Sequence, residues 1–308
     1  MNIFTTDFFF SIIRIATPIL FATLAAVISE KGGVTNIGLE GIMMMSALFG
    51  SLGAYWTGNW FVGLLIAMAV GLCEALLMGF FAFNLKTDII LTGTAINMIG
   101  SGGTLFLVKV ITGGASTTNL ITKSLQVPSI NIPGIKSIPV IGAVISGHSL
   151  LTYLGFLFVF LTWVLLYKTP LGLNIRSVGE NPNAASSVGV SVAKVRYITI
   201  GIGGILAGLG GAYMSMYYAM GWSLDMVAGR GFIALAAQSM GGGEPVGSML
   251  AALVFGFAQA LGIKVSATGV DSNLVAPIPY IVTIISLVIF ALNQRRKDQK
   301  RHAASALN

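Results

Sequence analysis

The sequence predicts an all-α fold, a polytopic helical bundle in the inner (cell) membrane, and three observations support this prediction. Of the 308 residues, 55% are hydrophobic and only 9% are charged, whereas about a quarter of the residues in an average soluble domain are charged. The mean hydropathy is +0.88. Apolar runs that approach the roughly 20 residues of a membrane-crossing helix recur along the whole chain. Most of the outer surface is therefore expected to face lipid.

About nine of these runs, with a range of eight to ten, are expected to form transmembrane helices. In chain order they cover residues 9–29, 42–57, 60–85, 88–110, 149–167, 197–218, 230–243, 246–264 and 277–292. The second and seventh runs are shorter than a full crossing, so each could be a half-helix or a re-entrant segment buried among other helices. Glycines cluster in the sixth run and favour close packing, because small residues let helix backbones approach one another in lipid.

Positive charges set the expected orientation, because Lys and Arg collect in cytoplasmic loops. The two most basic segments, the loop 168–196 and the tail 294–308, should therefore both be cytoplasmic. Counting crossings back from the loop places the N-terminus outside, with eleven cationic residues inside, five outside and Arg14 in the membrane. The five outside are Lys109, Lys123, Lys136, Arg230 and Lys264. No loop is long enough for a soluble catalytic domain, so we expect residues 1–308 to form a single transmembrane domain.

Several classes of function are excluded because the sequence lacks the residue types or motifs that they need. Few charges argue against nucleic-acid binding, and the two histidines, His148 and His302, lie in separate loops, so no metal site is expected. Cys73 is the only cysteine, which excludes a disulfide framework. Ser101 has no histidine in any span to activate it as a protease nucleophile. A phosphate-binding G-x-x-x-x-G-K-[ST] loop is absent, so ATP and magnesium would have to be bound by a partner chain and no cofactor is expected here.

A few polar residues interrupt the apolar runs and are candidates for a substrate pathway. A charge at bilayer depth costs about 3 kcal/mol on insertion scales, so Glu74 should face protein or water, where it would sense protons, line a path or pair structurally. The candidates are Glu74, Thr92, Thr94, Asn97 and Gln238. An interhelical hydrogen bond is the alternative role for each. Four aromatic residues at a predicted outer boundary are expected to form an interfacial belt rather than a base-stacking site; these are Tyr213, Tyr217, Tyr218 and Trp222.

The loop 168–196 contains the signals of a short helix. Asn181 is a typical N-cap, Pro182 suits the first helical position and Gly189 supplies a C-terminal stop. Ser191 can then cap a second helix that continues into the sixth run. The result would be a knob of about two turns tied between two membrane helices, which could transmit force. An ordinary capped loop is the alternative.

Two glycine-bracketed segments, 32–41 and 228–237, precede the two short runs. The predicted topology places the first inside and the second outside, which is the arrangement that an inverted repeat produces in a transporter. Half-helix termini at such points can bind polar substrate groups, and simple helix breaks are the alternative. The residues of these break motifs are Gly33, Asn36, Gly38, Glu40, Gly229, Arg230 and Gly231.

Three stretches together resemble a known family: Glu30 to Gly41 with Met43 to Met45, the loop Gly179 to Arg196, and Gly229 to Pro245 with the ending Gly-Gly-Gly-Glu-Pro-Val-Gly. They are similar to permease subunits of ABC importers in the branched-chain amino acid, ribose and nucleoside group. The resemblance covers nearly the whole chain, and the residue sequences of both break motifs look most like those of the nucleoside and simple-sugar permeases. Longer relatives carry a further N-terminal span, which leaves the span count open by one.

This resemblance implies that the helix from about Pro182 to Val188 docks as a coupling helix in a cleft of a cytoplasmic ABC ATPase. The residues carried over to that role are Glu180, Asn181, Pro182, Ala184, Ala185, Val188 and Gly189. It also implies a second, longer homologous permease and an extracytoplasmic substrate-binding lipoprotein that delivers a nucleoside. A simple-sugar permease is the close alternative. A proton-coupled transporter using Glu74 and a membrane scaffold without transport are alternatives from other classes.

Overall fold

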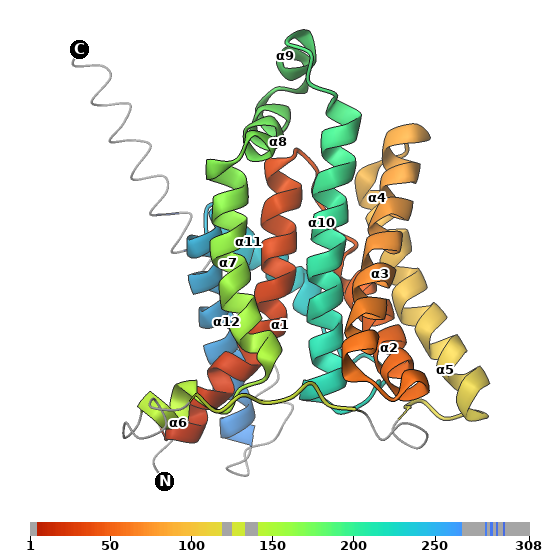
Figure 1. Ribbon diagram of the computed structural model, residues 1–308, viewed down its shortest axis with the longest axis vertical. Coiled ribbons are helices and arrows are strands. Elements are labelled where there is room, and N and C mark those ends of the chain that lie inside the picture. Colours follow the sequence, from red (N-terminus) through yellow and green to blue (C-terminus); the bar gives the residue numbers. More distant parts are fainter. Residues whose placement is uncertain are drawn as a thin grey trace.

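The computed structural model of the chain describes residues 5–118, 125–132 and 141–266, together with helical positions 281, 284, 285, 288 and 292. Over these residues the fold is all-helical: two isolated β-bridges occur and no strand. Figure 1 shows the long helices side by side in one bundle, with the short helix α9 projecting from one end. The predicted all-α bundle is therefore confirmed, while most of the ninth run and the whole basic tail lie outside the described residues.

Six helical segments in this part of the chain are long and apolar enough to cross a membrane. They are Thr6–Lys31 (α1), Trp60–Asn84 (α3, Trp60–Gly79, with the π-helical turn η1, Phe80–Asn84), Ile89–Thr112 (α4, Ile89–Met98; η2, Ile99–Gly103; α5, Thr104–Thr112), Leu150–Lys168 (α7), Val192–Tyr218 (α10, Val192–Tyr213, with η3, Met214–Tyr218) and Pro245–Ser266 (α12). Each corresponds to one of the nine predicted runs. The chain is thus a multi-pass membrane protein, and the number of crossings beyond these six stays a prediction.

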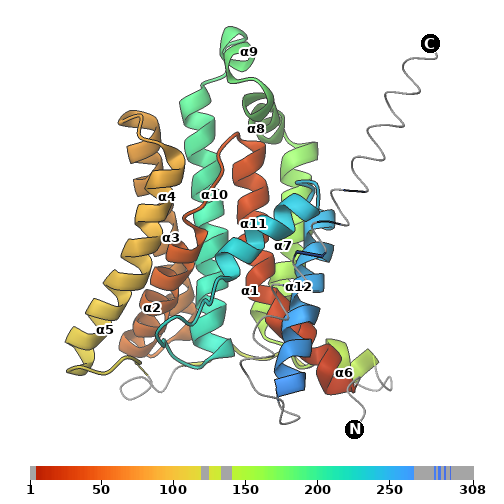
Figure 2. The ribbon, with the colours of Figure 1, turned by 180° about the vertical axis from the view of Figure 1, so that it is seen from behind.

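The two short runs form α2 (Leu39–Thr57) and α11 (Arg230–Met240), and neither is among the six. With 11 residues, α11 is about 16 Å long at 1.5 Å per residue, roughly half the thickness of a bilayer core. Figure 2 shows α11 lying obliquely across the middle of the bundle, whereas α2 lies toward the end opposite α9. The prediction that the seventh run is shorter than a full crossing is therefore supported. The second run is not short: α2 has 19 residues, the same number as the crossing helix α7, so its length does not distinguish it from a full crossing.

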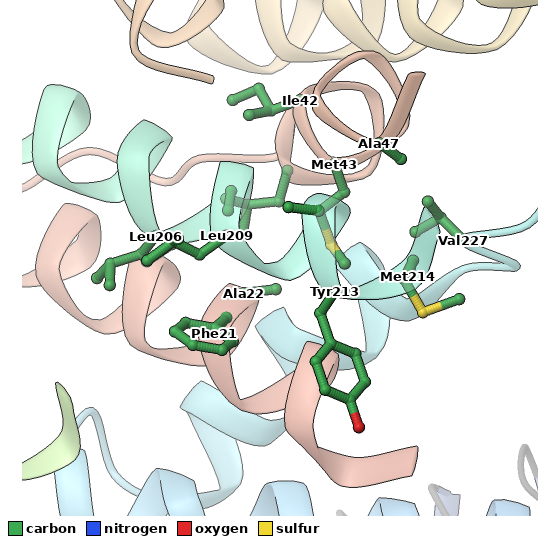
Figure 3. Packing of buried hydrophobic residues seen from close by; sticks show 14 of the residues in the cluster. Phe21, Ala22, Ile42, Met43, Ala47, Leu206, Leu209, Tyr213, Met214 and Val227 are labelled. Carbon is green, nitrogen blue, oxygen red and sulfur yellow. The ribbon is translucent and has the colours of Figure 1, made fainter. Parts of the chain in front are cut away.

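The centre of the bundle is formed by α1 and α10. In each, 83% of the most apolar stretch is buried, compared with 22% in the segment from α4 to α5, which is therefore peripheral. Figure 3 shows side chains from α1, α2, α10 and η3 meeting in one cluster. In this cluster Tyr213 is fully buried, and its hydroxyl donates a hydrogen bond of 3.0 Å to the carbonyl oxygen of Arg14.

The expectation of an interfacial aromatic belt is wrong for two of its four members. Tyr213 and Trp222 are both 0% exposed, whereas belt residues lie at the lipid–water boundary. Large aromatic rings contribute strongly to a protein core, and hydropathy alone does not distinguish a core ring from an interfacial one. Tyr217 and Tyr218 are partly exposed.

The glycines of α10 allow its neighbours to approach closely, as the sequence predicts. A Cβ on Gly204 would lie 2.5 Å from the Cβ of Ala75 and would also contact the carbonyl oxygen of Gly71 on α3. A Cβ on Gly208 would lie 2.6 Å from the carbonyl oxygen of Ala67. No side chain fits in these spaces, so α3 and α10 pack backbone against backbone.

Replacing Gly204 with alanine is expected to destabilise the protein by about 1–3 kcal/mol, because the added methyl group forces α3 and α10 apart. The control is Gly102→Ala in η2, where a Cβ would meet no atom within 4 Å. Thermal unfolding of both variants in detergent checks the prediction. Equal melting temperatures for Gly204→Ala and Gly102→Ala would contradict it.

Two short helices, α8 (Pro170–Glu180) and α9 (Pro182–Ser187), lie at one end of the bundle. The N-terminal end of α1 lies at the opposite end, near α6 (Ile141–Ile145). At that opposite end the imidazole of His148 stacks on Phe10 with 3.9 Å between ring centroids. His148 accepts or donates a hydrogen bond of 2.9 Å with the carbonyl oxygen of Val144, and burial lowers the pKa of its imidazole. The environment of His148 is that of a neutral core residue.

Candidate coupling helix and central helix breaks

The loop 168–196 forms the short helix α9 where the capping signals place it. The side-chain oxygen of Asn181 accepts hydrogen bonds from the backbone N–H groups of Asn183, at 3.1 Å, and Ala184, at 3.0 Å. Pro182 is the first helical residue. Gly189 has a φ of +87°, a conformation that glycine adopts without strain. The predicted cap, start and stop are therefore the ones that the chain uses.

A second helix in the same loop, α8, was not predicted. It begins with the same signal as α9, because the hydroxyl of Thr169 accepts a 3.0 Å hydrogen bond from the N–H of Gly172 and Pro170 is the first helical residue. Only Asn181 separates α8 from α9. The projecting unit is therefore a pair of helices, and we refer to residues 170–189 as the knob.

The residues of the knob that were carried over as coupling residues divide into two groups. Ala185 is 3% exposed and packs in a small cluster with Val178 of α8 and Val195 of α10. Val188 is 79% exposed. Glu180, Asn181, Ala184 and Gly189 are also exposed, and Pro182 is partly exposed. A partner can therefore contact Ala184 and Val188, whereas the side chain of Ala185 anchors α9 to the rest of the protein.

The base of the knob contacts the first break motif through backbone atoms. A Cβ on Gly33 would lie 3.2 Å from the Cα of Gly179, and a Cβ on Gly179 would meet the carbonyl oxygen of Lys31. Gly33 also has a φ of +72°. Both glycines are thus needed for the close approach of the last turn of α8 to the end of α1.

A cavity of about 340 Å³ opens beside this contact. Its lining residues are Glu30, Lys31, Tyr167, Arg176, Gly179, Glu180 and Glu244. Across it the ammonium group of Lys31 lies 3.0 Å from a carboxylate oxygen of Glu244, and the hydroxyl of Tyr167 donates to the same carboxylate at 2.5 Å. The lysine and glutamate side chains are 25% and 50% exposed, so the ion pair contributes at most about 1 kcal/mol. Its main effect is to tie the turn between α11 and α12 to α1 and α7.

The two break motifs, which the sequence places on opposite sides of the membrane, meet inside the bundle. One carboxylate oxygen of Glu40, in the first turn of α2, accepts a 2.8 Å hydrogen bond from the N–H of Gly229. The other accepts a 2.7 Å hydrogen bond from the N–H of Gly231, in the first turn of α11. The side chain of Glu40 therefore joins the N-terminal ends of α2 and α11, although its two partners lie 189 and 191 residues farther along the chain.

Asn97 of α4 completes this junction. Its side-chain oxygen accepts a 2.8 Å hydrogen bond from the N–H of Gly41, and its side-chain nitrogen donates at 2.9 Å to the carbonyl oxygen of Ile37. Asn36 accepts from the N–H of Gly38 at 3.1 Å. Of the alternatives for Asn97, the geometry favours an interhelical hydrogen bond, because both ends of its amide are already paired with backbone groups.

Arg230 is 7% exposed and donates to the carbonyl oxygens of Met226 and Val227. Its side chain is therefore buried in the protein, and the outer side of the membrane stays a prediction for this residue. The guanidinium group is accommodated because the preceding turn offers it backbone oxygens within the protein.

The other pathway candidates do not converge on one site. Thr92 donates at 2.8 Å to the carbonyl oxygen of Asp88, the N-cap of α4, and Thr94 donates at 2.8 Å to that of Ile90 in the same helix. Gln238 is 9% exposed and accepts from the hydroxyl of Ser239 at 3.2 Å. Glu74 is 8% exposed, and its Oε2 atom has no hydrogen-bond partner among the described residues. In that part of the chain no hydrogen bond connects any two of the five candidates, and no group of three His, Cys, Asp or Glu could hold a metal ion.

Comparison with known proteins agrees with these features. The family described as branched-chain amino acid transport system / permease component matches residues 8–292. The chain is 39% identical over 287 residues to the guanosine ABC transporter permease protein NupQ of Bacillus subtilis (strain 168), covering 89% of each chain. It is 33% identical over 290 residues to the nucleoside ABC transporter permease protein NupC of Lactococcus lactis subsp. cremoris (strain MG1363), covering 89% of each chain.

A third relative is named for a sugar. The chain is 34% identical over 254 residues to the putative glucose ABC transporter permease protein TsgC13 of Haloferax volcanii (strain ATCC 29605), covering 82% of this chain and 75% of the relative. No solved structure matches the chain. The family match covers most of the sequence, and the relatives are named as transport subunits rather than enzymes. The chain therefore belongs to the permease component family of branched-chain amino acid transport systems.

Proposed function

We propose that this chain is the permease subunit of an ATP-driven, binding-protein-dependent importer that moves nucleosides across the cell membrane. The observation that carries the proposal is the knob, a pair of capped helices that projects from one end of the bundle and is anchored through Ala185. The similarity to permeases named for guanosine and nucleosides supports the substrate class. Coupling to a separate ATPase is the role that such a knob can perform in a chain without a phosphate-binding loop.

The proposed orientation has the knob in the cytoplasm and the N-terminus outside. It is supported by the positive charges of the described residues, because the end that carries the knob has more of them and Lys and Arg favour the cytoplasmic side. The cationic residues at that end are Lys31, Lys86, Lys168, Arg176, Lys194 and Arg196. Lys109 and Lys264 lie toward the other end. The basic tail 294–308 would add to the cytoplasmic charge.

The proposed assembly contains three kinds of partner. A cytoplasmic ABC ATPase would bind ATP and magnesium and contact the exposed face of α9. An extracytoplasmic substrate-binding lipoprotein would deliver the nucleoside. A second homologous permease would cover the peripheral segment from α4 to α5, where Thr94 and Ser101 are exposed between apolar side chains. The substrate path would then run at the interface of the two permeases or within the bundle.

The experiment that tests the proposal is ATP hydrolysis and uptake by the reconstituted complex of both permeases, ATPase and binding protein. We expect nucleosides to stimulate ATP hydrolysis and to be taken up only with ATP, and uptake to persist when an uncoupler removes the proton gradient. Stimulation by pentoses or glucose alone would instead support the sugar permease suggested by the third relative. Uptake that is abolished by an uncoupler and by Glu74→Gln would replace the proposal with proton-coupled transport.

A further inference from the structure

The contact of Glu40 with Gly229 and Gly231, here called the junction, brings the N-terminal ends of two helices together. The N-terminal end of a helix carries about half a positive charge, so the ends of α2 and α11 would repel each other if nothing lay between them. The carboxylate of Glu40 lies in the first turn of α2 and accepts from two N–H groups at the start of α11. One negative charge therefore stabilises both helix ends, and each hydrogen bond to it is charge-assisted.

The junction is also tightly packed. A Cβ on Gly231 would lie 2.5 Å from the backbone nitrogen of Glu40, so the first turn of α11 lies directly against the backbone of α2. Asn97 fastens the same turn of α2 to α4. Three helices are thus joined within a few ångströms of one carboxylate.

A short ordered segment connects this junction to the knob. Gly179 at the base of the knob contacts Gly33, and only residues 34–39 separate Gly33 from Glu40. Val34 and Asn36 in this segment are 2% and 1% exposed. Backbone hydrogen bonds fix it to the end of α1, from Gly33 to Glu30 at 2.9 Å and from Val34 to Ser29 at 3.0 Å. Gly33 and Thr35 are exposed, so the segment is partly buried, and its hydrogen bonds make it a defined connection between the base of the knob and Glu40.

The other end of α11 is held at the same place. Four residues after α11 ends, Glu244 bonds to Lys31 and Tyr167 beside the base of the knob. Glu40 holds the start of α11 and Glu244 fixes the turn that follows it. This second contact ties the far end of α11 to α1 and α7, which adjoin the knob, and not to the knob itself.

We propose that Glu40 is a positioning residue for transport, which holds α11 to α2 so that movement of the knob is transmitted to α11 and, through it, to α12. This inference rests on the proposed function, in which the ATPase moves the knob. Glu40 does not contact the substrate in this proposal. Its carboxylate keeps α2 and the half-helix α11 moving as one unit.

The test compares Glu40→Gln with Asp7→Asn in the reconstituted complex. Glutamine keeps the shape of Glu40, but its single oxygen replaces only one acceptor and its NH₂ group faces the second N–H donor. Asp7 is an exposed carboxylate in the first turn of α1, at the end of the bundle opposite the knob, so Asp7→Asn removes one charge without touching the junction. We expect Glu40→Gln to lower the nucleoside taken up per ATP hydrolysed about tenfold or more, and Asp7→Asn to leave this ratio unchanged.

A second readout does not depend on transport. Loss of one acceptor oxygen should raise hydrogen exchange at the N–H of Gly229 or Gly231 in the assembled complex about tenfold, again in Glu40→Gln only. An unchanged coupling ratio in a folded Glu40→Gln complex, or unchanged exchange at residues 229–231, would overturn the inference. If wild type shows no ATP-dependent nucleoside uptake, the proposed function fails, and the exchange data still report whether Glu40 holds α11.

Should Glu40→Gln fail to assemble, Gly231→Ala provides the same test with the carboxylate intact. The added methyl group has no space against Glu40, so it should separate α11 from α2 and lower the coupling ratio. The control is Gly155→Ala in α7, where a Cβ would meet side-chain atoms only at the ordinary contact distances of 3.5 to 3.6 Å. A normal coupling ratio in Gly231→Ala would count against the inference.

Discussion

The Ala184→Arg variant is expected to reduce nucleoside-stimulated ATP hydrolysis and uptake to background while leaving the melting temperature of the permease unchanged. Ala184 is exposed on α9, so an arginine there extends into the space that the ATPase would occupy. Its own chain loses no packing. Co-purification of the ATPase with the permease, together with uptake in proteoliposomes, measures the effect.

The neighbouring alanine gives a matched comparison. Ala185 is 3% exposed in the cluster that anchors α9, and burying an unpaired guanidinium group there costs about 3–5 kcal/mol. Ala185→Arg should therefore also abolish uptake, but with a loss of knob structure that appears as faster proteolysis or hydrogen exchange in residues 170–189. Ala184→Ser should behave as wild type. Normal uptake by Ala184→Arg would show that this face of α9 does not contact an ATPase.

The local signals of the sequence predicted the knob well, because caps act within one turn. Asn181, Pro182 and Gly189 have the roles in the structure that their residue types favour. The same reasoning applied to Thr169 and Pro170 predicts α8, which also starts with a capping side chain followed by proline. This helix was missed although its evidence was present.

The sequence did not indicate which residues of α9 are exposed. A helix of six residues is too short for its apolar periodicity to indicate which side is buried. Ala184 and Ala185 are indistinguishable in sequence, and only the position of α8 and α10 decides that Ala185 faces inward. The choice of the residue that a partner contacts therefore needed the structure.

The meeting of the two break motifs could not be predicted from local patterns. Glu40 bonds to backbone N–H groups of Gly229 and Gly231, and a backbone donor leaves no side-chain signature in the sequence. Helix breaks were visible as glycine-rich segments, but their partners lie far along the chain. Aromatic residues posed a similar problem, because Tyr213 and Trp222 are apolar enough for a belt or a core and tertiary packing placed them in the core.

Replacing Asn97 with leucine is expected to destabilise the permease by about 2–4 kcal/mol, because it leaves the N–H of Gly41 and the carbonyl oxygen of Ile37 without partners. Thermal unfolding in detergent measures this loss. Asn97→Asp keeps the acceptor for Gly41 but turns a carboxylate oxygen toward the carbonyl oxygen of Ile37, so its melting temperature should also fall below that of wild type.

A control on the same helix separates a structural role of Asn97 from contact with the substrate. Thr94 is exposed one turn earlier and bonds only to its own helix at Ile90, so Thr94→Val should change the melting temperature little. If Asn97 instead contacts the nucleoside, Asn97→Asp would raise the KM for uptake and leave the melting temperature at the wild-type value. A lowered melting temperature with an unchanged KM is the result expected here, because both ends of the Asn97 amide are occupied by the backbone that begins α2.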